Sequence, residues 1–147
     1  MAVCGMEISR NREEEHLIHN SIDEILALKT WAVVGLSNNT FRAAYSVAEL
    51  LQEQGHRIVP VHPTAETVHG EKGYVSLAAI PFEIDVVDVF VNSSLAGAVI
   101  DQAISIGAKA VWLQLGVIDE VGVARASAAG LLTVMDRCPA IEYGKRS

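Results

Sequence analysis

The segment spanning residues 35–42 holds the residues best suited to bind an anion. It follows an apolar run and precedes a stretch with helical spacing, so it should lead into the first turn of a helix. Unpaired backbone N–H groups and the helix dipole attract negative charge there. Gly35 permits a tight turn, while Ser37 and Asn38 offer hydrogen-bonding side chains. Arg42 adds a positive charge. This combination predicts a phosphate site, and a pyrophosphate suits it best.

The established nucleotide motifs are incomplete around this segment. Leu36, Ser37 and Asn38 follow Gly35, so the dinucleotide pattern G-x-G-x-x-G is not met. The Walker pattern is missing as well. An NAD site usually has an acid near the end of the second strand, and the chain reads Val61-His62-Pro63 at that place. These absences argue against NAD.

Residues with catalytic or metal-binding chemistry are few. The three histidines of the middle region do not have the spacing of helix-borne or finger-type metal ligands. Cys138 follows Arg137 after the last expected strand, so a reactive thiol at this position stays open as an alternative. We therefore predict no metal site and assign no catalytic residue. The three histidines are His56, His62 and His69.

Composition limits the class of protein. The chain has 147 residues, of which 50% are hydrophobic and 20% charged, and this balance excludes a disordered chain. The net charge of −7 argues against a nucleic-acid partner. No apolar run approaches the ~20 residues of a membrane helix, and no secretory signal opens the chain. Two cysteines near opposite ends fit a reducing compartment, so we expect a cytoplasmic protein.

The order of the expected elements predicts an α/β fold, a doubly wound parallel sheet of Rossmann-like, three-layer form. Apolar strands alternate with helices of about ten to twelve residues. We expect residues 21–147 to form one domain, preceded by a charged arm over residues 1–20. A capping box at Ser21 and Glu24 should begin the first helix, and Ser93 and Ser94 should cap a later one. The expected strands are 31–35, 57–61, 85–90, 110–114 and 131–135, and the expected helices are 22–29, 43–54, 95–106 and 119–129, with a single turn at 77–80.

Several stretches, taken together and in this order, resemble the small single-domain CoA-binding proteins. That family is related to the CoA-binding domain of the succinyl-CoA synthetase alpha subunit. The resemblance covers about residues 21–143. The matching stretches are Ala32-Val33-Val34-Gly35-Leu36-Ser37, Ile58-Val59-Pro60-Val61-His62-Pro63, Gly70-Glu71-Lys72, Ser76-Leu77, Ile80-Pro81, Asp85-Val86-Val87-Asp88-Val89-Phe90, Ala110-Val111-Trp112-Leu113-Gln114-Leu115-Gly116, Ala129-Gly130-Leu131 and Met135-Asp136-Arg137-Cys138.

The resemblance implies coenzyme A as the ligand. The loop after the first strand would hold the pyrophosphate, and the ends of the second and middle strands would flank the adenosine. Arg42 and Lys72 are the remaining candidates for the 3′-phosphate. By position, the implied binding residues are Gly35, Leu36, Ser37, Asn38, Asn39, His62, Pro63, Val91, Asn92 and Ser93.

The chain departs from the family pattern in the first loop. Thr40, Ala43 and Ala44 stand where the family usually has two prolines and a serine. His62 replaces a usual asparagine, and Val91 replaces a usual arginine. We expect a CoA or acyl-CoA binding protein without evident catalysis, with a protein partner or a homo-oligomer possible. The alternatives are a binder of another nucleotide of the NAD or ADP-ribose type, an acyl-CoA or thiol enzyme using Cys138, and a scaffold without a ligand.

Overall fold

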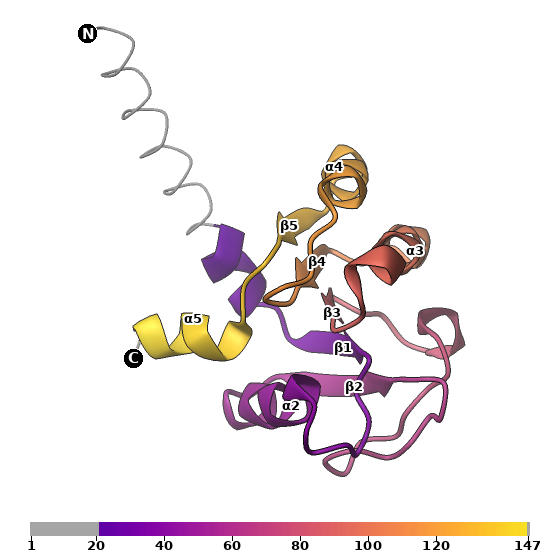
Figure 1. Cartoon of the computed structure of the whole chain (residues 1–147), viewed down its shortest axis with the longest axis vertical. Coiled ribbons are helices and arrows are strands. Elements are labelled where there is room, and N and C mark those ends of the chain that lie inside the picture. Colours follow the sequence, from indigo (N-terminus) through magenta and orange to yellow (C-terminus); the bar gives the residue numbers. More distant parts are fainter. Residues whose placement is uncertain (1–20, 147) are drawn as a thin grey trace, which may run out of the picture.

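The computed structural model describes residues 21–146, and its centre is a five-stranded parallel sheet (Figure 1). The strands lie in the order β2-β1-β3-β4-β5. This order is the doubly wound arrangement in which β1 and β3 are neighbours although their connections lead in different directions. The strand bounds are β1 Thr30–Val34, β2 Arg57–Val61, β3 Val86–Val89, β4 Ala110–Leu113 and β5 Leu132–Val134.

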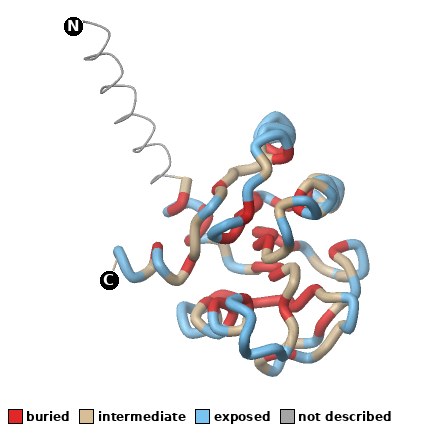
Figure 2. Tube along the Cα trace, viewed as in Figure 1, coloured by how far each residue is buried: buried red, intermediate tan, exposed pale blue. Residues whose placement is uncertain are grey.

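Helices cover both faces of the sheet. Helix α2 (Ala43–Glu53), helix α5 (Pro139–Arg146) and the helical residues 21–26 pack on one face. The 3-10 turn η1 (Leu77–Ala79), α3 (Ser93–Ser105) and α4 (Glu120–Ala128) cover the other. Figure 2 shows the consequence, with buried strands between helices whose outer sides are exposed. The predicted fold class is confirmed.

The local sequence patterns predict most elements to within two residues. Strand β2 has the expected bounds, and its Pro60 is accommodated because β2 is an edge strand of the sheet. Helix α5 has no counterpart among the expected elements, although Pro139 at its start and Lys145 near its end are typical helix-terminal residues.

Two predicted caps are wrong. Ser21 is already helical, and α3 begins at Ser93 with Asn92 as its N-cap residue. The Ser93 hydroxyl is used elsewhere: it accepts from Ile118 N at 2.9 Å. In contrast, Asp119 caps α4 by accepting from Gly122 N at 2.9 Å, so the helix begins at Glu120, one residue after the expected start.

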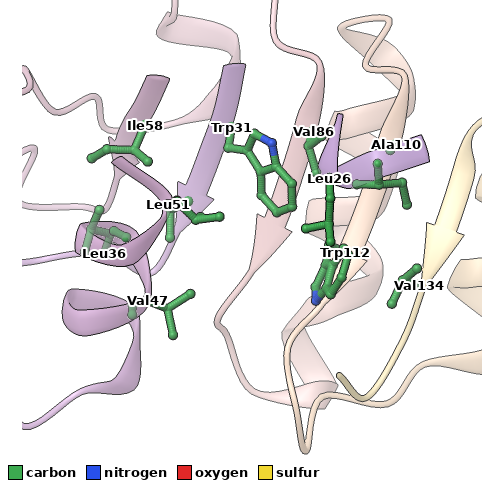
Figure 3. Close-up of a cluster of buried hydrophobic side chains, with 14 of the residues drawn as sticks. Leu26, Trp31, Leu36, Val47, Leu51, Ile58, Val86, Ala110, Trp112 and Val134 are labelled. Atoms are coloured by element: carbon green, nitrogen blue, oxygen red, sulfur yellow. The ribbon is translucent and has the colours of Figure 1, made fainter. Parts of the chain in front are cut away.

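The core on the α2 and α5 face is built around two tryptophans (Figure 3). The Trp31 and Trp112 rings lie 5.7 Å apart at a tilt of 45°. Each indole N–H donates to a carbonyl, Trp31 to Leu28 at 3.0 Å and Trp112 to Arg137 at 2.8 Å. The two bonds satisfy the buried donors and tie the segment before β1 and the segment after β5 to this core. No helix among residues 21–146 is long and apolar enough to cross a membrane.

Candidate functional site

The carboxyl ends of β1, β2 and β3 meet at one edge of the sheet. The connection after β1 leads to α2 on one face, while the connection after β3 leads to α3 on the other. Ligands of doubly wound sheets bind at such a switch point. The topology therefore places the candidate site beside the loop formed by residues 35–42.

Gly35 is required by the geometry at this switch point. Its N–H donates to Val61 O at 2.8 Å, and Phe90 N donates to Val34 O at 2.9 Å, so the turn after β1 is held between the ends of β2 and β3. Its φ is +103°, and a Cβ would lie 2.6 Å from Phe90 O. Only glycine satisfies both conditions.

The rest of the loop is organised by its own polar groups. Asn39 N donates to the Ser37 hydroxyl at 3.3 Å, and Phe41 N donates to Asn39 Oδ1 at 3.0 Å. Helix α2 then begins after Arg42 without a side-chain cap and with no acid in its first turn. Its first N–H groups and the positive end of its dipole are therefore available to an anion.

The predicted residues of the loop differ in whether their side chains are buried or exposed. Leu36 is fully buried in the core, so only its backbone can reach a ligand. The Arg42 side chain is exposed, and its guanidinium makes no hydrogen bond or ion pair with the described residues, which leaves it free to pair with a phosphate. The Arg42 backbone N–H donates to Asn39 O at 3.1 Å. Phe41, which the sequence analysis did not select, is 98% exposed beside it.

A hydrogen-bond network joins this loop to the connection after β2. Asn38 Nδ2 donates to Glu66 Oε1 at 3.2 Å and to Thr67 O at 3.0 Å. The Thr64 hydroxyl donates to Glu66 Oε2 at 2.7 Å and lies 2.9 Å from His62 Nδ1. Pro63 is exposed at the turn between them. Asn38 and His62, predicted separately from two loops, thus belong to one network.

An acid, Glu66, lies five residues beyond the end of β2, although none directly follows that strand at Val61-His62-Pro63. Its carboxylate joins the loops after β1 and β2, since it accepts from Asn38, 28 residues away in the sequence, and from Thr64, two residues away. Hydrogen bonds from Thr64 and Asn38 hold the pKa of Glu66 below its usual value, so the group is charged at neutral pH. No local sequence pattern marked this residue, because the connection has neither helical nor strand periodicity.

The residues after β3 contribute unequally. Val91 packs against the core on the α3 and α4 face, whereas Asn92 is exposed at the start of α3. The Ser93 hydroxyl accepts from Ile118 N and lies 3.4 Å from Gly116 O, so it ties this segment to the loop after β4. Asn92 is thus the residue of this group with a side chain open to a ligand.

Two further predicted residues are held by other contacts. The Lys72 ammonium lies over the Tyr74 ring, 5.3 Å from its centroid. Cys138 is a free, half-buried thiol that packs against the core, and its carbonyl accepts from Glu142 N at 3.0 Å. The Arg137 guanidinium lies 3.9 Å from the Glu142 carboxylate. No contact in the described residues pairs the Cys138 thiol with a base.

Buried polar atoms lie below the same edge of the sheet. Asp88, fully buried on β3, has no hydrogen-bond partner for either carboxylate oxygen among the described residues. Gln114, which directly follows β4, has an unpartnered Oε1. Burial raises the pKa of Asp88 well above its usual value. Asp88 pairs in register with Val33 of β1, so this buried acid lies next to the strand that carries the candidate anion loop.

The model of the CoA-binding domain family matches residues 29–144. The chain belongs to this family. The family assignment predicted from the sequence motifs is therefore confirmed, and the matched range contains all of the loops described above.

Individual relatives agree with the assignment. YneT, an uncharacterized protein of Bacillus subtilis, is 35% identical over 118 residues, which are 80% of this chain and 87% of YneT. A hypothetical protein from Pyrococcus horikoshii, whose structure is known, shares 39% identity with a TM-score of 0.82 over 86% of this chain and 90% of its own. A 61-residue stretch, 41% of this chain, is 39% identical to 13% of the alpha subunit of the ADP-forming acetate–CoA ligase II of Pyrococcus furiosus.

Proposed function

We propose that this protein binds coenzyme A or a close derivative of it, and that it grips the ADP moiety. The pyrophosphate would lie at the loop after β1, against the N-terminus of α2. The observation that carries the proposal is the match of a CoA-binding domain to residues 29–144, with Gly35 in close approach to Phe90 at the switch point. The similarity to part of an acetate–CoA ligase subunit supports it.

The chemistry of the loop suits a diphosphate. Backbone N–H groups at the start of α2 would donate to its oxygens, and Arg42 would add a charge-assisted bond. The apolar and exposed Phe41 would shield the ligand on the solvent side. The His62 ring, the Thr64 hydroxyl and the Glu66 carboxylate of this region contact one another, and the proposal is binding without catalysis.

The test is calorimetric titration and thermal melting with coenzyme A, acetyl-CoA, dephospho-CoA, NAD and ATP. At a hundred times its dissociation constant a ligand stabilises the fold by ~2.7 kcal/mol. We expect the CoA forms to raise the melting temperature more than NAD and ATP do. Tighter binding of NAD would favour the alternative nucleotide function, and the absence of binding by every compound would reject both.

A matched pair of variants tests the location. Arg42→Ala removes the exposed cation of the loop and should weaken CoA binding about tenfold, as expected for one charge-assisted bond. Arg125→Ala is the control, because Arg125 is also exposed but lies on α4 and pairs with Asp101 at 3.0 Å. Equal effects of the two substitutions would place the ligand elsewhere.

A further inference from the structure

The carboxylate of Glu66 lies between the loops that follow β1 and β2. Oε1 accepts from Asn38 and Oε2 accepts from Thr64. A carboxylate offers about four lone-pair positions, so each oxygen keeps a further position for a donor. Within the part of the chain that the structure describes, no lysine or arginine pairs with Glu66, and His62 is the titratable neighbour that acts on its charge.

The backbone holds this carboxylate in a defined place. Ala65 N donates to His62 O at 2.8 Å, and Ala65 has a φ of 49°, which a residue with a Cβ seldom adopts. Gly73 packs directly beneath, since a Cβ there would lie 2.1 Å from Glu66 O. The position of Glu66 is therefore determined by tertiary packing and does not depend on a bound ligand.

Glu66 follows the strand that, in this fold, lies near the ribose of a bound nucleotide. In doubly wound sheets that bind a dinucleotide, the adenosine half lies over the strand next to β1 on the side away from the switch point. An acid at the end of that strand accepts a hydrogen bond from a ribose hydroxyl. Strand β2 has that place in the order β2-β1-β3-β4-β5. A ribose hydroxyl is a donor that a carboxylate can accept from, whereas a phosphate on the same ribose is an anion that a carboxylate repels.

We propose that Glu66 accepts a hydrogen bond from the adenosine ribose and makes the site prefer a ligand whose ribose carries no phosphate. This inference rests on the proposed function, because it takes the pyrophosphate to lie at the loop after β1. It specifies the ligand class further: dephospho-CoA and its acyl derivatives bind more tightly than the 3′-phosphorylated forms.

The experiment compares CoA with dephospho-CoA by calorimetry on the full chain. We expect dephospho-CoA to bind about fivefold more tightly, the size of one charge–charge repulsion at close range in water. Glu66→Gln keeps the shape of the side chain and removes its charge, so it should bring the ratio of the two affinities close to one. Glu71→Gln is the matched control, since Glu71 belongs to the same connection and its carboxylate makes no contact with the network.

The outcomes separate this inference from the proposed function. Binding of CoA as tight as, or tighter than, dephospho-CoA would overturn the preference and leave CoA binding intact. An unchanged affinity ratio in Glu66→Gln, with melting temperature preserved, would overturn the role of Glu66. Binding of neither compound to the natural chain would overturn the proposed function and this inference with it.

Discussion

Gly35 and Phe90 approach each other so closely that no side chain fits between them. A Cβ on Gly35 would lie 2.6 Å from the Phe90 carbonyl oxygen, and the φ of Gly35 is +103°. The contact joins the carboxyl ends of β1 and β3, the two strands at the switch point of the sheet. The candidate ligand loop therefore begins from a fixed backbone position, and this contact is open to a direct test.

Gly35→Ala should destabilise the fold by about 3 kcal/mol, the sum of positive-φ strain and steric overlap. Gly130→Ala is the control, because Gly130 has a similar φ of +92° but open space where its Cβ would be. Gly130→Ala should lower the free energy of unfolding only by the strain of the positive φ, about 1 kcal/mol. Urea unfolding of both variants measures the difference, and equal losses would contradict a role for the contact with Phe90.

Asp88→Asn should raise stability at neutral pH. Burial raises the pKa of Asp88 in the folded state, so the stability that this group contributes is complete below its unfolded pKa of about 3.9 and is lost as pH rises through the folded value. The neutral amide avoids this loss. Melting temperatures should therefore differ little near pH 4 and by several degrees near pH 7.

Asp101→Asn serves as the control for that series. Asp101 is exposed and pairs with Arg125 on the surface, so its replacement should change stability by less than about 1 kcal/mol at any pH. If the stability change caused by Asp88→Asn were equally independent of pH, a partner of the Asp88 carboxyl would have to offset the free-energy cost of its burial.

His56 should make the fold less stable in mild acid. Its Nδ1 lies 2.8 Å from Leu28 O, its Nε2 contacts the Tyr143 hydroxyl, and desolvation lowers its pKa below the usual 6.5. A lowered folded pKa means that the contribution of His56 is complete above pH 6.5 and is lost as pH falls through the folded value. Melting temperature recorded from pH 7.5 to 5 should show this decline.

His56→Gln isolates the contribution of the imidazole. The variant should be less stable at pH 7.5, because the buried hydrogen bonds of the ring are lost at about 1 kcal/mol each. The difference from the natural chain should shrink as pH falls, since glutamine does not titrate. A constant difference between pH 7.5 and 5 would show that His56 does not cause the acid sensitivity.

Phe41→Ala should leave the stability of the free protein unchanged but weaken CoA binding. The ring is 98% exposed and therefore adds little to the core, yet it lies beside the proposed diphosphate position. Burial of one side of the ring against the ligand would contribute about 1.5 kcal/mol, so a loss of roughly tenfold in affinity is expected. Val121→Ala, 70% exposed on α4, should change neither property. A tenfold loss of CoA affinity in Val121→Ala, with no loss in Phe41→Ala, would indicate that the ligand binds near α4 instead.

The strands and helices were accessible from sequence because their signals are local. Strand β2 was predicted with its observed bounds, and β1 is marked by an apolar run that ends at Gly35. Buried parallel strands need continuous apolar residues, and the helices that cover them need one apolar face. The resemblance of several such stretches to one family then indicated the ligand, and the family match confirmed that membership.

Tertiary structure decided which side chains meet at the sheet edge. Asn38 and Glu66 are 28 residues apart, and nothing in either loop indicated their contact. The burial of Asp88 without a partner likewise depends on the neighbouring strands. Local periodicity records only the face that a residue presents within its own element. The meeting of two irregular loops depends on packing across the whole sheet, as at Gly73 beneath Glu66, and that information appears only in the folded chain.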